Sequence, residues 1–333
     1  MVSKRAYIIR KLVYVFITLM VIISFNFFLF RIMPGDPAAV LAPRTGMDSE
    51  LRQAIYENFS LDKPLANQYV DYIVQVFTLD WGISTGVRKY ADIMEIMRPA
   101  LMNTVILLGT GTVLAIIIGV NLGKFAAWRR GKPSDAITMS AALVFYSMPT
   151  FLFALFMLVV FAGNLEWFPI RGSEGYLPFA GDVDIDDMGL GAKLISRLYH
   201  LVLPLTAFTL EIMAEFAIIM RNSLTDVLTE DYIVTARAKG LSNKQILNDH
   251  AMRNALLPVV TVMAISIGWV LGGTIMVEMV FSYEGLGLMT WDAVLAQDYA
   301  LLQALFLLMA LAVLVANFIA DIAYVYLDPR VRI

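Results

Sequence analysis

Residues 230–258 read Glu-Asp-Tyr-Ile-Val-Thr-Ala-Arg-Ala-Lys-Gly-Leu-Ser-Asn-Lys-Gln-Ile-Leu-Asn-Asp-His-Ala-Met-Arg-Asn-Ala-Leu-Leu-Pro, and apolar sequence long enough to cross a bilayer lies on both sides of them. Asp231 stands at the start of this polar stretch, and Arg237 and Lys239 follow six and eight residues later, which suits the dipole of a short helix. Gly240 then occupies the position where a helix C-cap needs a residue that takes positive φ. The pattern predicts a short helix that ends at Gly240.

A second helix is predicted to follow directly. Ser242 has Gln245 three residues later, which is the spacing of a capping box at a helix N-terminus. Pro258 comes just inside the next apolar run, and because proline lacks a backbone N–H we expect it near the start of a helix. The polar stretch is therefore interpreted as two short helices between two membrane spans.

The composition is that of a membrane protein. Hydrophobic residues make up 59% of the 333 residues and charged residues only 16%, far from the average of soluble domains. The chain has no cysteine, which excludes disulfides, thiolate catalysis and cysteine metal sites. A phosphate loop is also not found: Gly119 to Lys124 is one residue short of the required spacing, and Phe125 follows instead of Ser or Thr. We therefore expect a multi-pass membrane protein that does not itself hydrolyse ATP.

The apolar runs predict membrane-spanning helices joined by polar segments. The first run, Leu12 to Phe30, has 19 residues, and at about 1.5 Å per residue this is just enough to span a bilayer. An uncleaved span is favoured over a signal peptide, because the run is long and no small-x-small cleavage site follows it. Six spans are expected, at about 12–30, 101–127, 137–162, 200–220, 256–280 and 300–327.

The charge distribution predicts the orientation of these spans. Positive residues concentrate in short segments: 15 of the 25 Lys and Arg lie in 1–11, 124–135, 221–255 and 326–333. The acids concentrate elsewhere: 18 of the 28 lie in 31–100, 163–200 and 281–300. By the positive-inside rule, both termini and the polar stretch 230–258 are expected in the cytoplasm.

The sequence contains one pattern typical of a hydrolase and one typical of a calcium site, and both lack residues that the function requires. Gly82-Ile83-Ser84-Thr85-Gly86 fits the G-x-S-x-G pattern of a hydrolase nucleophile, but the two histidines, His200 and His250, are expected on opposite sides of the membrane. An acidic cluster comprises Asp182, Asp184, Asp186 and Asp187, and it lacks the glycine and glutamate positions of an EF-hand. We therefore assign no catalytic residue and no metal site.

Several motifs resemble one protein family. Thr-Ala-Arg-Ala-Lys-Gly at 235–240, followed by Leu257-Pro258, resembles the "EAA" loop of permease subunits in binding-protein-dependent ABC importers. The longer form that begins at Asp231-Tyr232 is similar to the dipeptide/oligopeptide permease family in particular. Further similar patches are Pro34-Gly35-Asp36-Pro37, Leu61-Asp62-Lys63-Pro64-Leu65, Leu79-Asp80-Trp81-Gly82-Ile83-Ser84 and residues 273–287, where Glu284 stands in place of the family's usual proline.

This resemblance implies an all-α integral membrane protein with six transmembrane helices, the type I ABC importer permease fold and an external insertion after the first helix. The implied parts are a cytoplasmic N-terminus with the first helix (1–30), an extracytoplasmic insertion (31–100), a core permease domain (101–327) with a cytoplasmic coupling loop (221–255), and a cytoplasmic C-terminus (328–333). The implied location is the plasma membrane of a prokaryote.

The resemblance also implies partners. They are a homologous second permease, two ATPase subunits that hold ATP and Mg, and an extracytoplasmic substrate-binding protein. The chain itself is expected to bind the lipid bilayer and to need no cofactor and no nucleic acid. Peptides are the expected cargo, and related systems that carry nickel or sugars remain open.

In the family, the short helix of the coupling loop docks into a groove on the ATPase. The resemblance therefore assigns ATPase coupling to Asp231, Tyr232, Thr235, Ala236, Arg237, Ala238, Lys239 and Gly240. A helix that enters a groove needs small side chains on the entering face, and we expect Ala236 and Ala238 to supply them.

A second group consists of residues inside the spans that line the pathway or bond neighbouring helices: Pro149, Glu211, Glu215, Glu278 and Asp321. Pro149 is expected to kink the third span, and Glu211 and Glu215 share one helix face because they are four residues apart. If such acids instead carried ions, the chain would be an ion-coupled secondary transporter. The spacing Gly119-x-x-x-Gly123 leaves open a close helix contact or a merely glycine-rich span.

Overall fold

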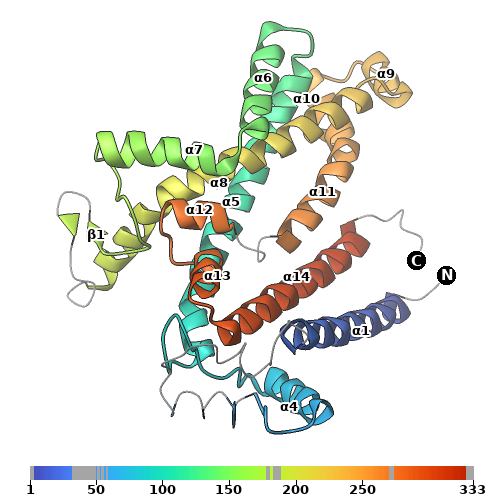
Figure 1. Ribbon diagram of the computed structural model, residues 1–333. Helices are drawn as coiled ribbons and strands as arrows, with labels where there is room; N and C mark the ends of the chain where they lie inside the picture. The colour runs from blue at the N-terminus through green and yellow to red at the C-terminus, as the bar shows by residue number, and fades with distance from the viewer. Residues whose placement is uncertain are drawn as a thin grey trace.

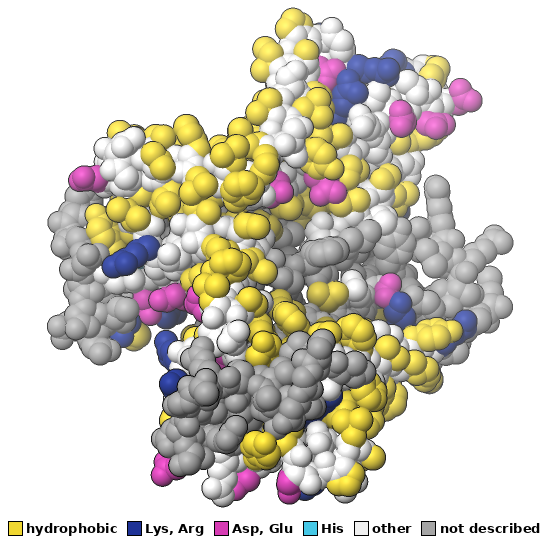
Figure 2. Space-filling view, in the orientation of Figure 1, with side chains coloured by type: hydrophobic (Ala, Val, Ile, Leu, Met, Phe, Trp, Pro, Cys, Tyr) yellow, Lys and Arg dark blue, Asp and Glu magenta, His cyan; other side chains and the backbone are white. Residues whose placement is uncertain are grey.

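A computed structural model describes residues 4–31, 50, 53, 56–57, 59–177, 181–182, 189–269 and 274–327 of the chain. Within this part, four helices are long and apolar enough to cross a membrane: α1 (Lys4–Arg31), α5 (Ile93–Trp128), α8 (Leu190–Val227) and α14 (Tyr299–Leu327). Hydrophobic side chains cover much of the visible surface of the upper helices (Figure 2). The protein is therefore a helical, multi-pass membrane protein.

The third expected span is broken. α6 (Pro133–Ser147) is followed by α7 (Thr150–Met157), which continues as a π-helix over Leu158–Asn164, and the two parts meet at 99°. The break lies at Met148 and Pro149, where proline removes a helical hydrogen bond. The predicted kink at Pro149 is confirmed, and it is sharper than a bend within one continuous helix.

The fifth expected span consists of α11 (Met252–Trp269) and α12 (Ile275–Val280), and residues 270–273 between them lie outside the described part. A further short helix, α13 (Leu286–Leu295), precedes α14. Because the described helices give four spans, or five with the bent pair, the count of six stays a prediction. Small elements complete the chain: α4 (Leu65–Thr78) and an antiparallel hairpin of β1 (Tyr176–Leu177) and β2 (Gly181–Asp182).

In the described part of the chain, the most extensive packing between two helices is that of α5 against α8. Two glycines on α5 make it close: a Cβ atom on Gly119 would lie 2.5 Å from the Met213 carbonyl oxygen, and one on Gly123 would lie 2.5 Å from the Ala217 carbonyl oxygen. Gly109 on the same helix has nothing within 4 Å of such an atom. The open question is thus resolved, because Gly119 and Gly123 form a close helix contact.

The first and last helices, α1 and α14, pack side by side (Figure 1). The side-chain amide of Asn26 on α1 donates to the carbonyl of Gln303 on α14 at 2.9 Å, and Lys11 forms an ion pair with Asp321. Since Lys11 is near the start of α1 and Asp321 near the end of α14, the two helices are antiparallel.

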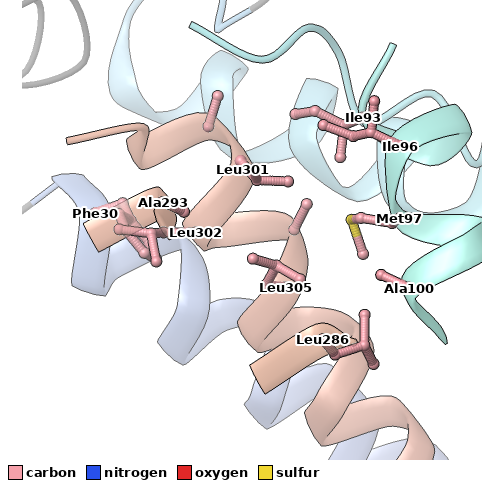
Figure 3. Close-up of a cluster of buried hydrophobic side chains, with 12 residues drawn as sticks. Phe30, Ile93, Ile96, Met97, Ala100, Leu286, Ala293, Leu301, Leu302 and Leu305 are labelled. Atoms are coloured by element: carbon pink, nitrogen blue, oxygen red, sulfur yellow. The ribbon is translucent and has the colours of Figure 1, made fainter. Parts of the chain in front are cut away.

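A shared hydrophobic core joins the first helix to the rest of the chain. It comprises Phe30 from α1, Ile93 and Met97 from α5, and Leu286 and Leu301 from α13 and α14, with further neighbours (Figure 3). These side chains come from segments far apart in the sequence and are almost fully buried. The end of α1, the start of α5 and the α13–α14 turn therefore form one packed unit.

Candidate coupling loop and buried acids

The candidate coupling loop, expected over residues 221–255, starts within the last turns of α8, and its first separate helix is α9 (Asp231–Ala238). Gly240 has φ +79°, so the predicted left-handed stop is confirmed. The capping box is also confirmed: the Ser242 backbone N–H donates to Gln245 Oε1 at 3.0 Å, and the Gln245 N–H donates to Ser242 Oγ at 3.4 Å. Local sequence alone specified both features, because each depends on residues within one helical turn.

The second helix is longer than expected. It starts as α10 (Asn243–Gln245), passes through a π-helical segment over Ile246–Ala251 and continues as α11. Pro258 lies inside α11, so the expectation that it marks a helix start is wrong. The helix begins at its polar capping box, well before the apolar run. One turn before the proline, Ser223 Oγ on α8 donates to the Ala255 carbonyl at 2.8 Å.

The two alanines of α9 face opposite ways. Ala236 is 6% exposed and Ile233, three residues earlier, is fully buried. Both belong to the same buried cluster as Ile246 and Ala251 of the following π-helical segment, which α9 contacts. Ala238 is exposed. The expectation that Ala236 presents a small side chain to a partner is therefore wrong. Its small size instead lets α9 lie close to the helix that follows.

The outer face of α9 is open and mostly polar. The exposed residues of the helix and of the two positions after it are Asp231, Tyr232, Val234, Thr235, Arg237, Ala238, Lys239 and Gly240. Two hydrogen bonds hold the loop in place: Asn254 Nδ2 donates to the Tyr232 hydroxyl at 2.8 Å, and Lys124 Nζ at the end of α5 donates to Asn248 Oδ1 at 2.7 Å. The structure thus brings the coupling candidates together on one exposed segment, with Ala236 beneath it.

The acids of the spans lie at separate places. Thr150 Oγ1, in the first turn of α7, donates to Glu211 on α8, and Glu215 lies half-buried one turn further along α8. Asp321 pairs with Lys11, as described. Pro149 is exposed at the break between α6 and α7. Glu211 and Asp321 therefore bond neighbouring helices.

Glu278 is fully buried. Its Oε1 accepts from Thr104 Oγ1 on α5 at 2.9 Å, and its Oε2 accepts from the Leu288 backbone N–H at the start of α13 at 3.0 Å. A Cβ atom on Gly285 would lie 2.4 Å from this carboxyl group, so only glycine fits there. Glu278 therefore joins α5, α12 and α13, and the open N–H groups of a helix start favour its carboxylate.

Sequence reasoning missed Asp298, which among the acids of the described residues accepts the most hydrogen bonds; it lies between α13 and α14 with no exposed surface. Its Oδ2 accepts from Ser84 Oγ at 2.5 Å and from the backbone N–H groups of Thr85, Gly86 and Val87 at 3.1, 2.9 and 3.1 Å. Its Oδ1 accepts from Thr85 Oγ1 at 3.0 Å. We call this arrangement, Asp298 with residues 84–87, the Asp298 clamp.

The clamp has two consequences. Burial alone would raise the pKa of Asp298, but the hydrogen bonds from Ser84 and from the backbone of residues 85–87 outweigh it, and the pKa lies below its ordinary value. The Ser84 hydroxyl of the G-x-S-x-G pattern donates to the Asp298 carboxylate. The lowered pKa of that carboxylate makes it a weak general base, whereas a nucleophilic serine needs a base that takes its proton. Of the contacts of Asp298, only one is local enough to be recognised from the sequence: its carboxylate caps the start of α14 by accepting from the Leu301 backbone N–H.

No group of three or more His, Cys, Asp or Glu in the described residues has the geometry of a metal site. Residues Asp184, Asp186 and Asp187 of the acidic cluster lie outside that part. His200 is buried and its Nδ1 lies 2.9 Å from the Ser196 carbonyl oxygen, far along the chain from His250 in the coupling loop.

A bundle of membrane-length helices with an exposed, capped polar loop between two of them defines a multi-pass membrane protein. Residues 111–333 match the family described as binding-protein-dependent transport system inner membrane component, and residues 4–88 match the N-terminal family of the same systems. The chain belongs to the binding-protein-dependent transport system inner membrane component family. It is thus a membrane permease component rather than a catalytic subunit.

Curated relatives match over nearly the full chain. The oligopeptide transport system permease protein AppB of Bacillus subtilis (strain 168) is 32% identical over 331 residues, which cover 98% of this chain and 99% of AppB. The dipeptide transport system permease protein DppB of Escherichia coli (strain K12) is 32% identical over 335 residues, with 98% of each chain covered. A glutathione transport system permease protein, GsiC of Shigella flexneri, is also 32% identical.

Among solved structures, the chain resembles inward-facing MetNI, a methionine ABC transporter, with a TM-score of 0.55 and 16% identity over 71% of this chain and 97% of the other. At this identity the likeness shows the fold alone, and it supports the type I importer permease fold expected from the sequence.

Proposed function

We propose that the chain is the membrane-spanning permease subunit of an ABC importer for di- or oligopeptides, in the plasma membrane of a prokaryote. The peptide cargo rests on relatives named as oligopeptide, dipeptide and glutathione permeases. Nickel and sugars are the other cargo classes to be tested.

The observation that carries this proposal is the exposed face of α9. It follows α8, a single helix of 38 residues, with only a short turn between them, and it leads into α11. A partner that pushes on α9 therefore pushes on the ends of two spans. Arg237 and Lys239 offer charged contacts on the open face, and Ala238 offers a small one.

In this proposal, two partner ATPase subunits hold ATP and Mg, and a homologous second permease completes the pathway. An extracytoplasmic binding protein delivers the peptide. When the ATPases close, α9 moves with them and α8 and α11 turn as rigid bodies, so that the pathway opens to the other side. This arrangement requires α9 and both chain ends in the cytoplasm, as the positive charges of those segments indicate.

Peptide uptake into vesicles tests the proposal. The reconstituted complex should take up a labelled dipeptide only with ATP and the binding protein, and labelled nickel or maltose should not enter. Uptake that follows an ion gradient without ATP would show a secondary transporter instead. In the docking test, Ala238→Leu should lower the amount of ATPase that co-purifies, whereas the matched Ala136→Leu, exposed on α6, should not.

A further inference from the structure

A cavity of about 710 Å³ lies at the end of the molecule opposite the coupling loop. Its walls come from the turn after the Asp298 clamp, the first turns of α5, the loop at Ser173 and the start of α13. Acidic and basic side chains lie close together in this region, beside α13 (Figure 2). The volume is within the range of sites for small ligands.

The cavity carries unpaired charges of both signs. Arg88 and Arg98 line it and are exposed, and neither forms an ion pair within the described part of the chain. Asp292 also lines it and forms no ion pair there. By contrast, Arg197 is engaged by Glu174 at 2.7 Å. The free charges are thus two guanidinium groups and a carboxylate.

A second carboxylate is held in place. Glu284 Oε2 accepts from Ser173 Oγ at 2.7 Å, and the Glu284 backbone carbonyl accepts from Asn103 Nδ2 on α5 at 2.9 Å. Arg88 is also positioned, because its backbone N–H donates to Ser84 Oγ, which is part of the Asp298 clamp. The charged rim therefore stands on a fixed scaffold, and a ligand need not order it first.

The rest of the lining is apolar and varied in shape. It includes Ile96, Ile106, Leu288 and Met289. Such a wall accepts side chains of different sizes, and methionine in particular adapts to irregular partners. Charged groups at the rim with an apolar wall between them match a molecule that has charged ends and variable apolar substituents.

We propose that this cavity is a receiving site for short peptides with free termini, a proposal that rests on the permease function above. Arg88 and Arg98 bind the peptide's terminal carboxylate, because a guanidinium group matches a carboxylate in charge and geometry. Glu284 and Asp292 bind its terminal ammonium group. The apolar wall holds the side chains with little selectivity, so that the two charged termini are what the site recognises.

The test measures binding without the binding protein. The assembled transporter in nanodiscs is titrated with alanyl-phenylalanine, and saturation-transfer NMR reports the bound peptide. The N-acetylated peptide and the C-terminal amide serve as comparisons. We expect the free dipeptide to bind, and each blocked form to bind about tenfold more weakly or worse, which is the effect of losing one charged hydrogen bond.

Variants locate the site. Arg98→Ala should weaken binding of the free dipeptide about tenfold but change binding of the C-terminal amide little, because the amide lacks the carboxylate. Asp292→Asn should likewise weaken binding of the free dipeptide about tenfold but change binding of the N-acetylated peptide little, because that peptide lacks the ammonium group. The matched control is Arg129→Ala, an exposed arginine at the other end of α5. Co-purification of the ATPases shows that each variant is assembled.

The outcomes separate this inference from the permease function. If ATP-driven uptake is normal but the dipeptide does not bind without its binding protein, or binds all variants equally, the inference is wrong and the permease function stands. If Arg98→Ala instead reduces only capture of the binding protein, the cavity is a protein docking surface and the inference is again wrong. A transporter without ATP-driven uptake would contradict the permease function itself.

Discussion

The Asp298 clamp and α9 are held in place by different kinds of contact: hydrogen bonds at the clamp, and mainly apolar contacts at α9. At the clamp, one buried carboxylate accepts hydrogen bonds from a turn more than 200 residues earlier in the chain. At α9, the buried contacts come from two apolar side chains, Ile233 and Ala236, and the other residues of the helix are exposed. Apolar contact tolerates small shifts, whereas a carboxylate surrounded by N–H groups does not, because displacement leaves buried donors unsatisfied.

This difference matches the division of work in the proposed importer. The cavity end is built from contacts that specify one geometry, which suits a site that must recognise a ligand. The coupling end presents a helix that rests on its neighbours through a small face and keeps its polar face open. A segment of that kind can move with a partner without breaking buried hydrogen bonds.

The largest expected effect comes from breaking the clamp. Asp298→Ala leaves four backbone N–H groups, those of residues 85–87 and of Leu301, and two hydroxyl groups without their acceptor. Since each buried unsatisfied group costs about 1–3 kcal/mol, the loss of unfolding free energy should be about 3 kcal/mol or more. Thermal unfolding of the purified protein in detergent, followed by circular dichroism, measures this.

Asp62→Ala, which removes an exposed carboxylate next to α4, is the control and should leave the transition unchanged. Asp298→Asn keeps one acceptor oxygen and should fall between the two. Equal unfolding temperatures for Asp298→Ala and the native chain would mean that the clamp does not contribute to stability.

A smaller effect is expected at the α5–α8 contact. In Gly123→Ala the new methyl group would lie 2.5 Å from the Ala217 carbonyl oxygen and 2.7 Å from Met220 Cβ, so the helices must separate. Overpacking of this kind costs about 1–3 kcal/mol. Gly109→Ala on the same helix meets nothing within 4 Å and should be neutral or slightly stabilising. Equal effects of the two substitutions on unfolding would contradict the close contact.

Features that depend on one or two turns of chain could be predicted from the sequence. Gly240 and the Ser242 capping box are local in this sense, and so is the break at Pro149. The Gly119 and Gly123 pair was recognisable as a candidate contact, but its partner helix was not. Each of these depends on backbone geometry that a short stretch of residues determines by itself.

Features that depend on distant pairing could not be predicted. Asp298 and Ser84 are 214 residues apart, and a turn of small residues gives no sign of the acid that it surrounds. The buried side of α9 was also hidden, because alanine suits an exposed face and a crowded one equally well. Ile233 was the available signal, since an apolar residue three positions before Ala236 indicates a shared buried face.

Substitutions of the two alanines of α9 test which face of this helix is buried and which is open. Ala236→Leu should destabilise the protein by about 1 kcal/mol, at the low end of overpacking, because α9 can shift outward. Ala238→Leu should change the unfolding temperature little, and it should reduce ATPase co-purification. If instead Ala238→Leu is the destabilising one, α9 is rotated from the orientation described.

The smallest expected effect is the pH dependence of the clamp near neutrality. Because the pKa of Asp298 is lowered in the folded protein, the carboxylate stabilises the fold above the pKa of the unfolded chain, and this contribution is lost only as the pH falls through the lower, folded pKa. The difference in unfolding temperature between the native chain and Asp298→Asn should therefore stay constant from about pH 5 to 8 and shrink only below the ordinary Asp pKa of about 3.9. A difference that already shrinks between pH 7 and 5 would mean that burial outweighs the hydrogen bonds of residues 84–87, and the hydrogen bonds of the clamp would then not hold this end of the molecule in one geometry.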